Sequence, residues 1–184
     1  MVPRTLRMVL LCAALVAGCS DAPEVEDPAA SGAYPEQETE SYHTRQTRAG
    51  IAVWELWGDR AESYPGEEMM LLHGVRMHFY EEGERTAVLT AREAEVDQAT
   101  EYTTARGEVV VVNAEGDQLE SEVLHWDPAT QEINTEEFVR FTRGDQLFTG
   151  YGMTTDPDLT NVQIHRQFEG DLPANQTSNE GEGR

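Results

Sequence analysis

The chain has 184 residues, of which 39% are hydrophobic, and its 35 acidic side chains against 13 basic ones give a formal charge of −22. The length fits one domain of ordinary size with flanking segments, and the hydrophobic fraction is sufficient for a folded core. Nucleic acid is excluded as a partner, because a polyanion repels so acidic a surface.

The first 18 residues have the proportions of a secretory signal peptide. Arg4 and Arg7 form a positive start, and residues 8–17 form an apolar stretch that is too short to span a bilayer as a helix. The sequence VAGC at residues 16–19 resembles the bacterial lipobox, in which cleavage before the cysteine leaves that residue lipidated. We predict a lipoprotein signal peptide at 1–18 and a lipid anchor on Cys19; an ordinary signal peptide with a chance cysteine is the alternative.

Cleavage would leave the mature chain without a free thiol. It removes Cys12 together with two arginines, which changes the charge from −22 to −24, and the remaining cysteine, Cys19, would carry lipid. We therefore expect no disulfide, no thiolate metal ligand and no cysteine nucleophile.

The segments on either side of the predicted domain are polar. Residues 20–50 hold three prolines and seven acids but few large aliphatic side chains, so we predict a disordered acidic tether over 19–50, beginning at the lipidated cysteine. Residues 173–184 are predicted to be a disordered tail. The folded domain is predicted to cover residues 51–172.

Short runs of alternating hydrophobicity, each near a glycine-containing turn, predict that this domain is all-β. The runs are residues 75–80, 109–112, 138–141 and 162–164. The glycines that close these segments, Gly83, Gly116, Gly144 and Gly170, are 33, 28 and 26 residues apart. Such spacing indicates an internal repeat.

A second element recurs at residues 56–64, 89–97, 119–127 and 148–156. Within it, Leu89 and Ala91 are two residues apart, whereas the next small apolar residue, Ala94, follows three residues later. One extra residue in a strand makes a bulge that bends the sheet. Stacked repeats, each of two or three short strands with a bend, therefore predict a long, curled and open sheet.

An open sheet leaves backbone groups unpaired on its first and last strands, and such edges favour a docking partner. The residues expected at the first edge are Ile51, Val53 and Trp57, and those at the last edge are Val162, Ile164 and Phe168.

Alignment of the repeats also predicts which side chains point into the interior. They are Trp54, Leu56, Met77, Phe79, Leu89, Val110, Val112, Leu119, Val139, Phe141, Phe148 and Ile164. Their neighbours along the strands are mostly polar. A dry core and a lipid-lined groove both need this pattern, so the alternation alone leaves the two open.

The repeats carry an ordered set of short motifs between residues 51 and 170. These are Leu89-Thr-Ala91 with Ala94 and Asp97, Gly107-Glu-Val-Val-Val, Gly116-Asp-Gln-Leu119-Glu-Ser121-Glu-Val-Leu124, Gln131-Glu-Ile133-Asn-Thr135 and Gly150-Tyr-Gly152. Together with a membrane-tethered N-terminus, this set resembles the LptC family of periplasmic lipopolysaccharide-export components and, more widely, the OstA-like superfamily.

The resemblance implies a twisted, V-shaped β-jellyroll whose interior holds the acyl chains of lipopolysaccharide. Members of the family work at the inner membrane with an ABC transporter and continue, by strand addition, into the next jellyroll of a periplasmic bridge. By analogy, the strand at 162–168 would face the bridge. The strand at 51–57 would face the periplasmic domains of the transporter permeases. An envelope scaffold lipoprotein with a closed core and no lipid cargo is the alternative.

The N-terminus departs from the family, whose familiar members have a transmembrane helix there. A lipid on Cys19 would equally tether the domain to the periplasmic face of a membrane. The family role favours the inner membrane, whereas Ser20, in place of the aspartate that retains lipoproteins there, favours the outer membrane.

No residue pattern indicates catalysis, so we predict no enzyme, no cofactor and no metal. His73 and His78 are five residues apart, which in a regular strand places them on opposite faces. His125 and Asp127 could share a face, and loss of turnover on replacement of His125 would favour an envelope hydrolase. The acidic residues near 156–160 lack the remaining ligands of a calcium loop.

Overall fold

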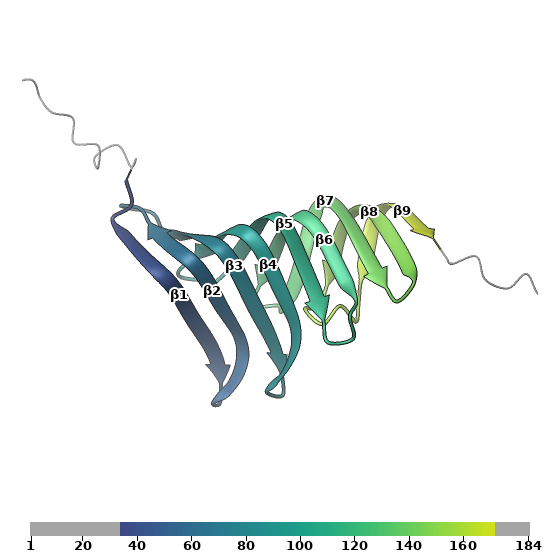
Figure 1. Ribbon diagram of the computed structural model, residues 1–184, viewed down its shortest axis with the longest axis horizontal. Coiled ribbons are helices and arrows are strands. Elements are labelled where there is room, and N and C mark those ends of the chain that lie inside the picture. Colours follow the sequence, from purple (N-terminus) through teal and green to yellow (C-terminus); the bar gives the residue numbers. More distant parts are fainter. Residues whose placement is uncertain (1–33, 172–184) are drawn as a thin grey trace, which may run out of the picture.

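The computed structural model describes residues 34–171, which form one antiparallel sheet of nine strands in chain order (Figure 1). The strands are β1 (Gln37–Arg48), β2 (Ile51–Ser63), β3 (Met69–Glu81), β4 (Glu84–Asp97), β5 (Thr103–Asn113), β6 (Gln118–Asp127), β7 (Glu132–Arg143), β8 (Gln146–Thr155) and β9 (Gln163–Asp171). The predicted all-β, open jellyroll is confirmed. The predicted signal peptide, the lipidated Cys19 and the tail at 173–184 lie outside the described residues.

In most pairs of neighbouring strands the register shifts once near the middle, as the spacing within the second element predicts. The shift falls between Thr90 and Glu93 where β4 meets β5, and between Ser121 and His125 where β6 meets β7. This line of irregularities divides the sheet into two arms. The hairpin arm ends in the tight turns near 49–50, 82–83, 114–116 and 144–145, and the loop arm ends in the turns near 64–68, 98–102, 128–131 and 156–162.

Apolar side chains fill the space between the two arms. In the hairpin arm, cross-strand neighbours form a buried row of Leu56, Met77, Leu89, Val111, Leu119 and Phe141. In the loop arm, the corresponding row is Ala61, Leu72, Ala94, Ala105 and Leu124. The two arms meet where the ring of Phe79 packs edge-on against Trp126, with centroids 4.9 Å apart. The core is therefore the inside of the V.

The folded region begins earlier than the composition predicts. Strand β1 pairs along its length with β2, so the prediction of a disordered tether is wrong for residues 37–48. Only scattered side chains of β1 are even partly covered, among them Tyr42 and Thr44. Backbone hydrogen bonds to β2 stabilise this polar strand, and amino-acid composition does not predict such bonds. A tight turn, with Ala49 and Gly50 both at positive φ, joins β1 to β2.

The two open edges of the sheet are consequently β1 and β9. The segment around Ile51, Val53 and Trp57 is strand β2, which pairs with β1 on one side and β3 on the other, so its prediction as an edge is wrong. At the other end, Ile164 and Phe168 lie on the last strand, β9, which pairs only with β8.

Candidate functional site

Most of the residues predicted to point inward do so. Those that are buried are Trp54, Leu56, Met77, Phe79, Leu89, Leu119, Val139 and Phe141. Phe148 and Ile164 are partly buried and pack against this cluster near the C-terminal edge. They form one apolar lining that extends from β2 to β9.

Val110 and Val112 do not belong to this lining. Val112 is 37% exposed, and the buried valines of β5 are Val109 and Val111. The repeat alignment made Val110 equivalent to Met77, because the segments were aligned by their closing glycines. The hairpins differ, however, in the length of their turns: Glu81 pairs with Glu84 across residues 82–83, whereas Asn113 and Asp117 are bonded across residues 114–116. The extra turn residue moves every side chain of the aligned segment by one position, to the other face of the sheet.

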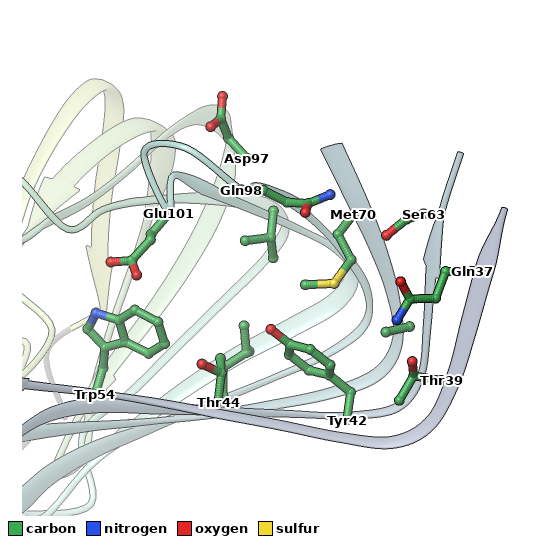
Figure 2. Close-up of a pocket in the computed structure, with 13 residues that line it drawn as sticks. Gln37, Thr39, Tyr42, Thr44, Trp54, Ser63, Met70, Asp97, Gln98 and Glu101 are labelled. Atoms are coloured by element: carbon green, nitrogen blue, oxygen red, sulfur yellow. The ribbon is translucent and has the colours of Figure 1, made fainter. Parts of the chain in front are cut away.

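The interior is hollow at its N-terminal end, between β1, β2 and the turn that joins β4 to β5 (Figure 2). We call this cavity of about 320 Å³ the mouth. Apolar side chains form part of its wall, namely Trp54, Leu56, Ala61, Met70 and Val96. The remainder is polar, and Figure 2 shows Tyr42, Gln98 and Glu101 on this wall. The mouth can therefore contact both an apolar chain and a polar group attached to it.

Tyr42 supplies a neutral hydrogen-bonding group to the mouth. Burial raises the pKa of its phenol above the ordinary value, which is itself about 10. The hydroxyl therefore keeps its proton at physiological pH and can donate a hydrogen bond to a ligand oxygen.

The middle of the interior is filled with side chains instead. Leu119, Ile133, Val139, Met153 and Leu159 are all 0% exposed. Four of them come from strands, whereas Leu159 belongs to the loop between β8 and β9. Here the sheet has the dry packing that a closed core would have, so the hollow at the mouth does not extend as an open groove through the described residues.

A second hollow, of about 450 Å³, lies at the C-terminal end, and we call it the exit. Phe141, Phe148 and Phe168 stack in succession along it, with ring centroids 6.0 and 5.8 Å apart. Phe168 is 60% exposed although it is large and apolar. The lining thus becomes accessible again at the last strand.

The residues considered for catalysis are engaged elsewhere. His125 contacts the Thr104 hydroxyl at 3.1 Å, while the Asp127 carboxylate accepts a hydrogen bond from the backbone of Ala129 in the following turn. Among residues 34–171, no group of three or more His, Cys, Asp or Glu side chains is arranged to hold a metal ion. The Asp156 carboxylate accepts backbone hydrogen bonds from Thr160 and Asn161 within its own loop.

The expectation that His73 and His78 lie on opposite faces is wrong. Burial in β3 alternates up to Leu72 and resumes three residues later at Val75, with Gly74 at positive φ between them. This extra residue returns both histidines to the outer face. His73 lies within 3.5 Å of Glu62 and 3.4 Å of Glu93, whereas the ring of His78 packs on Trp57 at 4.5 Å.

The fold and its interior define a class: a single open β-jellyroll with an apolar lining that is hollow at both ends. Residues 6–172 match the family model described as "Lipopolysaccharide-assembly, LptC-related", so the chain belongs to the LptC family, as its motifs predict. A search of curated proteins finds no matching sequence. Within the described residues, no helix is long and apolar enough to cross a bilayer.

Family membership makes this chain a component of lipopolysaccharide transport, bound to a membrane of the cell envelope. The family is one of transport components, which agrees with the expectation that the chain is not an enzyme.

Proposed function

We propose that the jellyroll holds the acyl chains of lipopolysaccharide between its arms and passes them from an inner-membrane ABC transporter to a periplasmic bridge. The observation that carries this proposal is the apolar lining that opens into a hollow at each end of the sheet. An acyl chain gains about 0.8 kcal/mol for each methylene that leaves water, so such a lining supplies the affinity.

The charge of the protein supports an orientation with the acyl chains inside the jellyroll and the head group outside. The formal charge of −22 repels phosphorylated sugars, whereas the lining is neutral. Lipopolysaccharide would therefore enter with its acyl chains inward and its head group in water. At the mouth, Tyr42 and Gln98 offer hydrogen-bond donors to the carbonyl oxygens where acyl chains are attached.

The two open edges suit partners on opposite sides. Strand β9 offers unpaired backbone groups beside the exit, and we assign this edge, with Ile164 and Phe168, to the next jellyroll of the bridge by strand addition. Val162, predicted at the same edge, lies just before β9 in the loop from β8. Strand β1 borders the mouth, and we assign it to the periplasmic domains of the transporter permeases. Lipid would then move from β1 toward β9.

The tether to the membrane is proposed to be a lipid on Cys19, with the inner membrane as its location. Mass spectrometry of the protein purified from membranes should find an N-terminal peptide that begins at a lipid-modified Cys19. Replacement by serine (Cys19→Ser) should prevent this modification and leave residues 1–18 attached. A native chain that retains residues 1–18 would contradict the lipid anchor without affecting the proposed cargo. Recovery of the protein with outer-membrane fractions would contradict the proposed location.

Photo-crosslinking in the native bacterium tests the cargo. A photoreactive phenylalanine analogue replaces Tyr42, which lines the mouth, or His43, the next residue along, which stacks on Trp57 outside at 4.8 Å. We expect a lipopolysaccharide adduct at position 42 and none at 43. Absence of adducts at both positions, in a folded and abundant protein, would contradict the proposal and favour a scaffold without lipid cargo.

A further inference from the structure

The loop between β8 and β9, residues 156–162, inserts a side chain into the packed middle of the jellyroll. We call this loop the strap. Its Leu159 is 0% exposed, like the strand residues around it, yet its backbone has a φ of +59°. A left-handed backbone is unfavourable for leucine, whose Cβ crowds the following carbonyl. The surroundings of Leu159 therefore hold it in a conformation that it does not favour by itself.

Polar contacts hold the strap across the open side of the V. The Arg143 guanidinium donates to the backbone oxygen of Leu159 and pairs with the Asp117 carboxylate at 2.6 Å. The Asn113 amide donates to the backbone oxygen of Asp158 at 2.9 Å. These three side chains belong to the hairpin arm, whereas the strap follows β8 in the loop arm. The strap therefore joins the free ends of the two arms.

The closed arrangement leaves one buried donor unsatisfied beside the strap. Trp126 is only 3% exposed, and its indole nitrogen is buried without a hydrogen-bond partner. The same tryptophan lines a cavity of about 350 Å³ together with Phe79, Asp156, Pro157 and Asp158. A buried donor without a partner is unfavourable, and an acceptor atom that entered here would relieve it.

We propose that the strap is a displaceable plug, and that Leu159 occupies, in the empty protein, the place that an acyl chain takes during passage. This inference rests on the proposed lipid-carrying function. A chain that moves from the mouth to the exit has to displace something from the packed middle. Strands β2 to β8 are each hydrogen-bonded on both sides along their length. The strap has no such ladder and is held by the apolar side chains of Leu159 and Val162, by a few polar contacts from hairpin-arm side chains and by turns within itself. Such a segment opens most readily, and a ligand that prefers the open state shifts the population toward it.

Binding of purified rough-type lipopolysaccharide to the full chain, extracted from membranes in detergent, tests the plug. Leu159→Gly removes the side chain and accepts the positive φ without strain. If a closed state competes with the ligand, this variant should bind about fivefold to tenfold more tightly. Arg140→Ala is the control for a substitution outside the interior, since Arg140 pairs with Glu120 at the exposed surface and does not contact the strap. Its affinity should equal that of the unaltered protein.

Hydrogen exchange on the unaltered protein gives a second readout that does not depend on a variant folding. The backbone amides of Leu159 and Thr160 are hydrogen-bonded within the strap, to the backbone and side chain of Asp156. Addition of lipopolysaccharide should make them exchange faster while the strands stay protected. Binding with unchanged exchange in the strap and unchanged affinity of Leu159→Gly would overturn the plug and leave the proposed function standing. No binding of lipopolysaccharide to any form would overturn both.

Discussion

The mouth and the middle of this jellyroll are lined by the same kind of strand, yet one is hollow and the other is packed. At the mouth, Trp54 and Leu56 line a cavity of about 320 Å³ together with polar side chains of β1 and of the turn after β4. In the middle, Leu119 and Val139 are 0% exposed and belong to the same buried cluster as Leu159 of the strap. Both regions alternate inward apolar residues with outward ones. The difference therefore arises from the segment that covers the open side of the V. The strap, an irregular loop, contributes to the packing of the middle, and the mouth has no corresponding loop among the described residues.

The largest effect should come from placing a charge in the middle of the interior. Phe79 is 2% exposed and packs on Trp126, so Phe79→Asp combines a lost aromatic contact with a buried, unpaired carboxylate. We expect a loss of about 5 kcal/mol or more in the free energy of unfolding, enough to unfold most domains of this size. His78→Asp, on the outer face, should cost about 1 kcal/mol. Urea denaturation measures both, and equal losses would mean that the inside and outside of β3 have been exchanged.

Two leucine truncations compare the hollow and packed regions directly. Leu119→Ala removes atoms from packing that cannot collapse, so we expect a loss of about 4 to 5 kcal/mol. Leu56→Ala enlarges a cavity that already exists at the mouth and should cost about 3 kcal/mol. Thermal or urea unfolding of both variants measures the difference. A larger loss for Leu56→Ala would indicate that the mouth is closed in solution.

The ion pair that holds the strap should matter more than the pairs on the outer surface. Asp117 is 5% exposed, so Arg143→Ala leaves a buried carboxylate without its cation, and we expect a loss of about 2 kcal/mol. In Arg140→Ala the affected pair with Glu120 is about half exposed and 3.9 Å long, and the loss should stay within about 0.5 kcal/mol. Indistinguishable unfolding midpoints would show that the strap contributes little to the folded state.

The smallest effect concerns a turn at the rim of the mouth and depends on pH. Backbone N–H groups of Thr100 and Ala99 donate to the Asp97 carboxylate and lower its pKa below the ordinary value. A lowered folded-state pKa contributes stability above the unfolded pKa of about 3.9, and this contribution is lost as the pH falls through the folded value. The stability gap between the unaltered protein and Asp97→Asn should therefore shrink below about pH 4. A gap that is constant from pH 7 to pH 2 would contradict this assignment.

Much of the fold follows from local pattern. The three-residue step from Leu89 and Ala91 to Ala94 predicts the bend, because a bulge is a local departure from alternation. Three of the glycines predicted to close turns, Gly83, Gly116 and Gly144, lie in turns of the hairpin arm, whereas Gly170 lies within β9 and pairs with Phe148. The error at Val110 and Val112 shows the limit, since closing turns of different geometry shift the register without changing the motif.

The rest depends on contacts between distant segments. Strand β1 has few apolar residues and is held by its ladder with β2, so composition predicts disorder where pairing produces a strand. The strap is a short loop in which only Pro157, Leu159 and Val162 are apolar, too few to predict burial from the sequence. Its position becomes evident only from the contacts that Arg143 and Asn113 make with it. These contacts determine whether the interior is hollow or packed, and the alternation of apolar and polar residues along the strands does not predict them.

The most direct test of the central claim is to follow lipid from one end of the interior to the other. Photoreactive side chains are placed at Tyr42 in the mouth and Phe148 in the exit, with His43 and Thr149 as neighbouring controls on the outer face. We predict lipopolysaccharide adducts at 42 and 148 and none at the controls, with the adduct at 148 lost when cellular ATP is depleted. Adducts at the controls, or none at 148 in energised cells, would contradict passage through the interior.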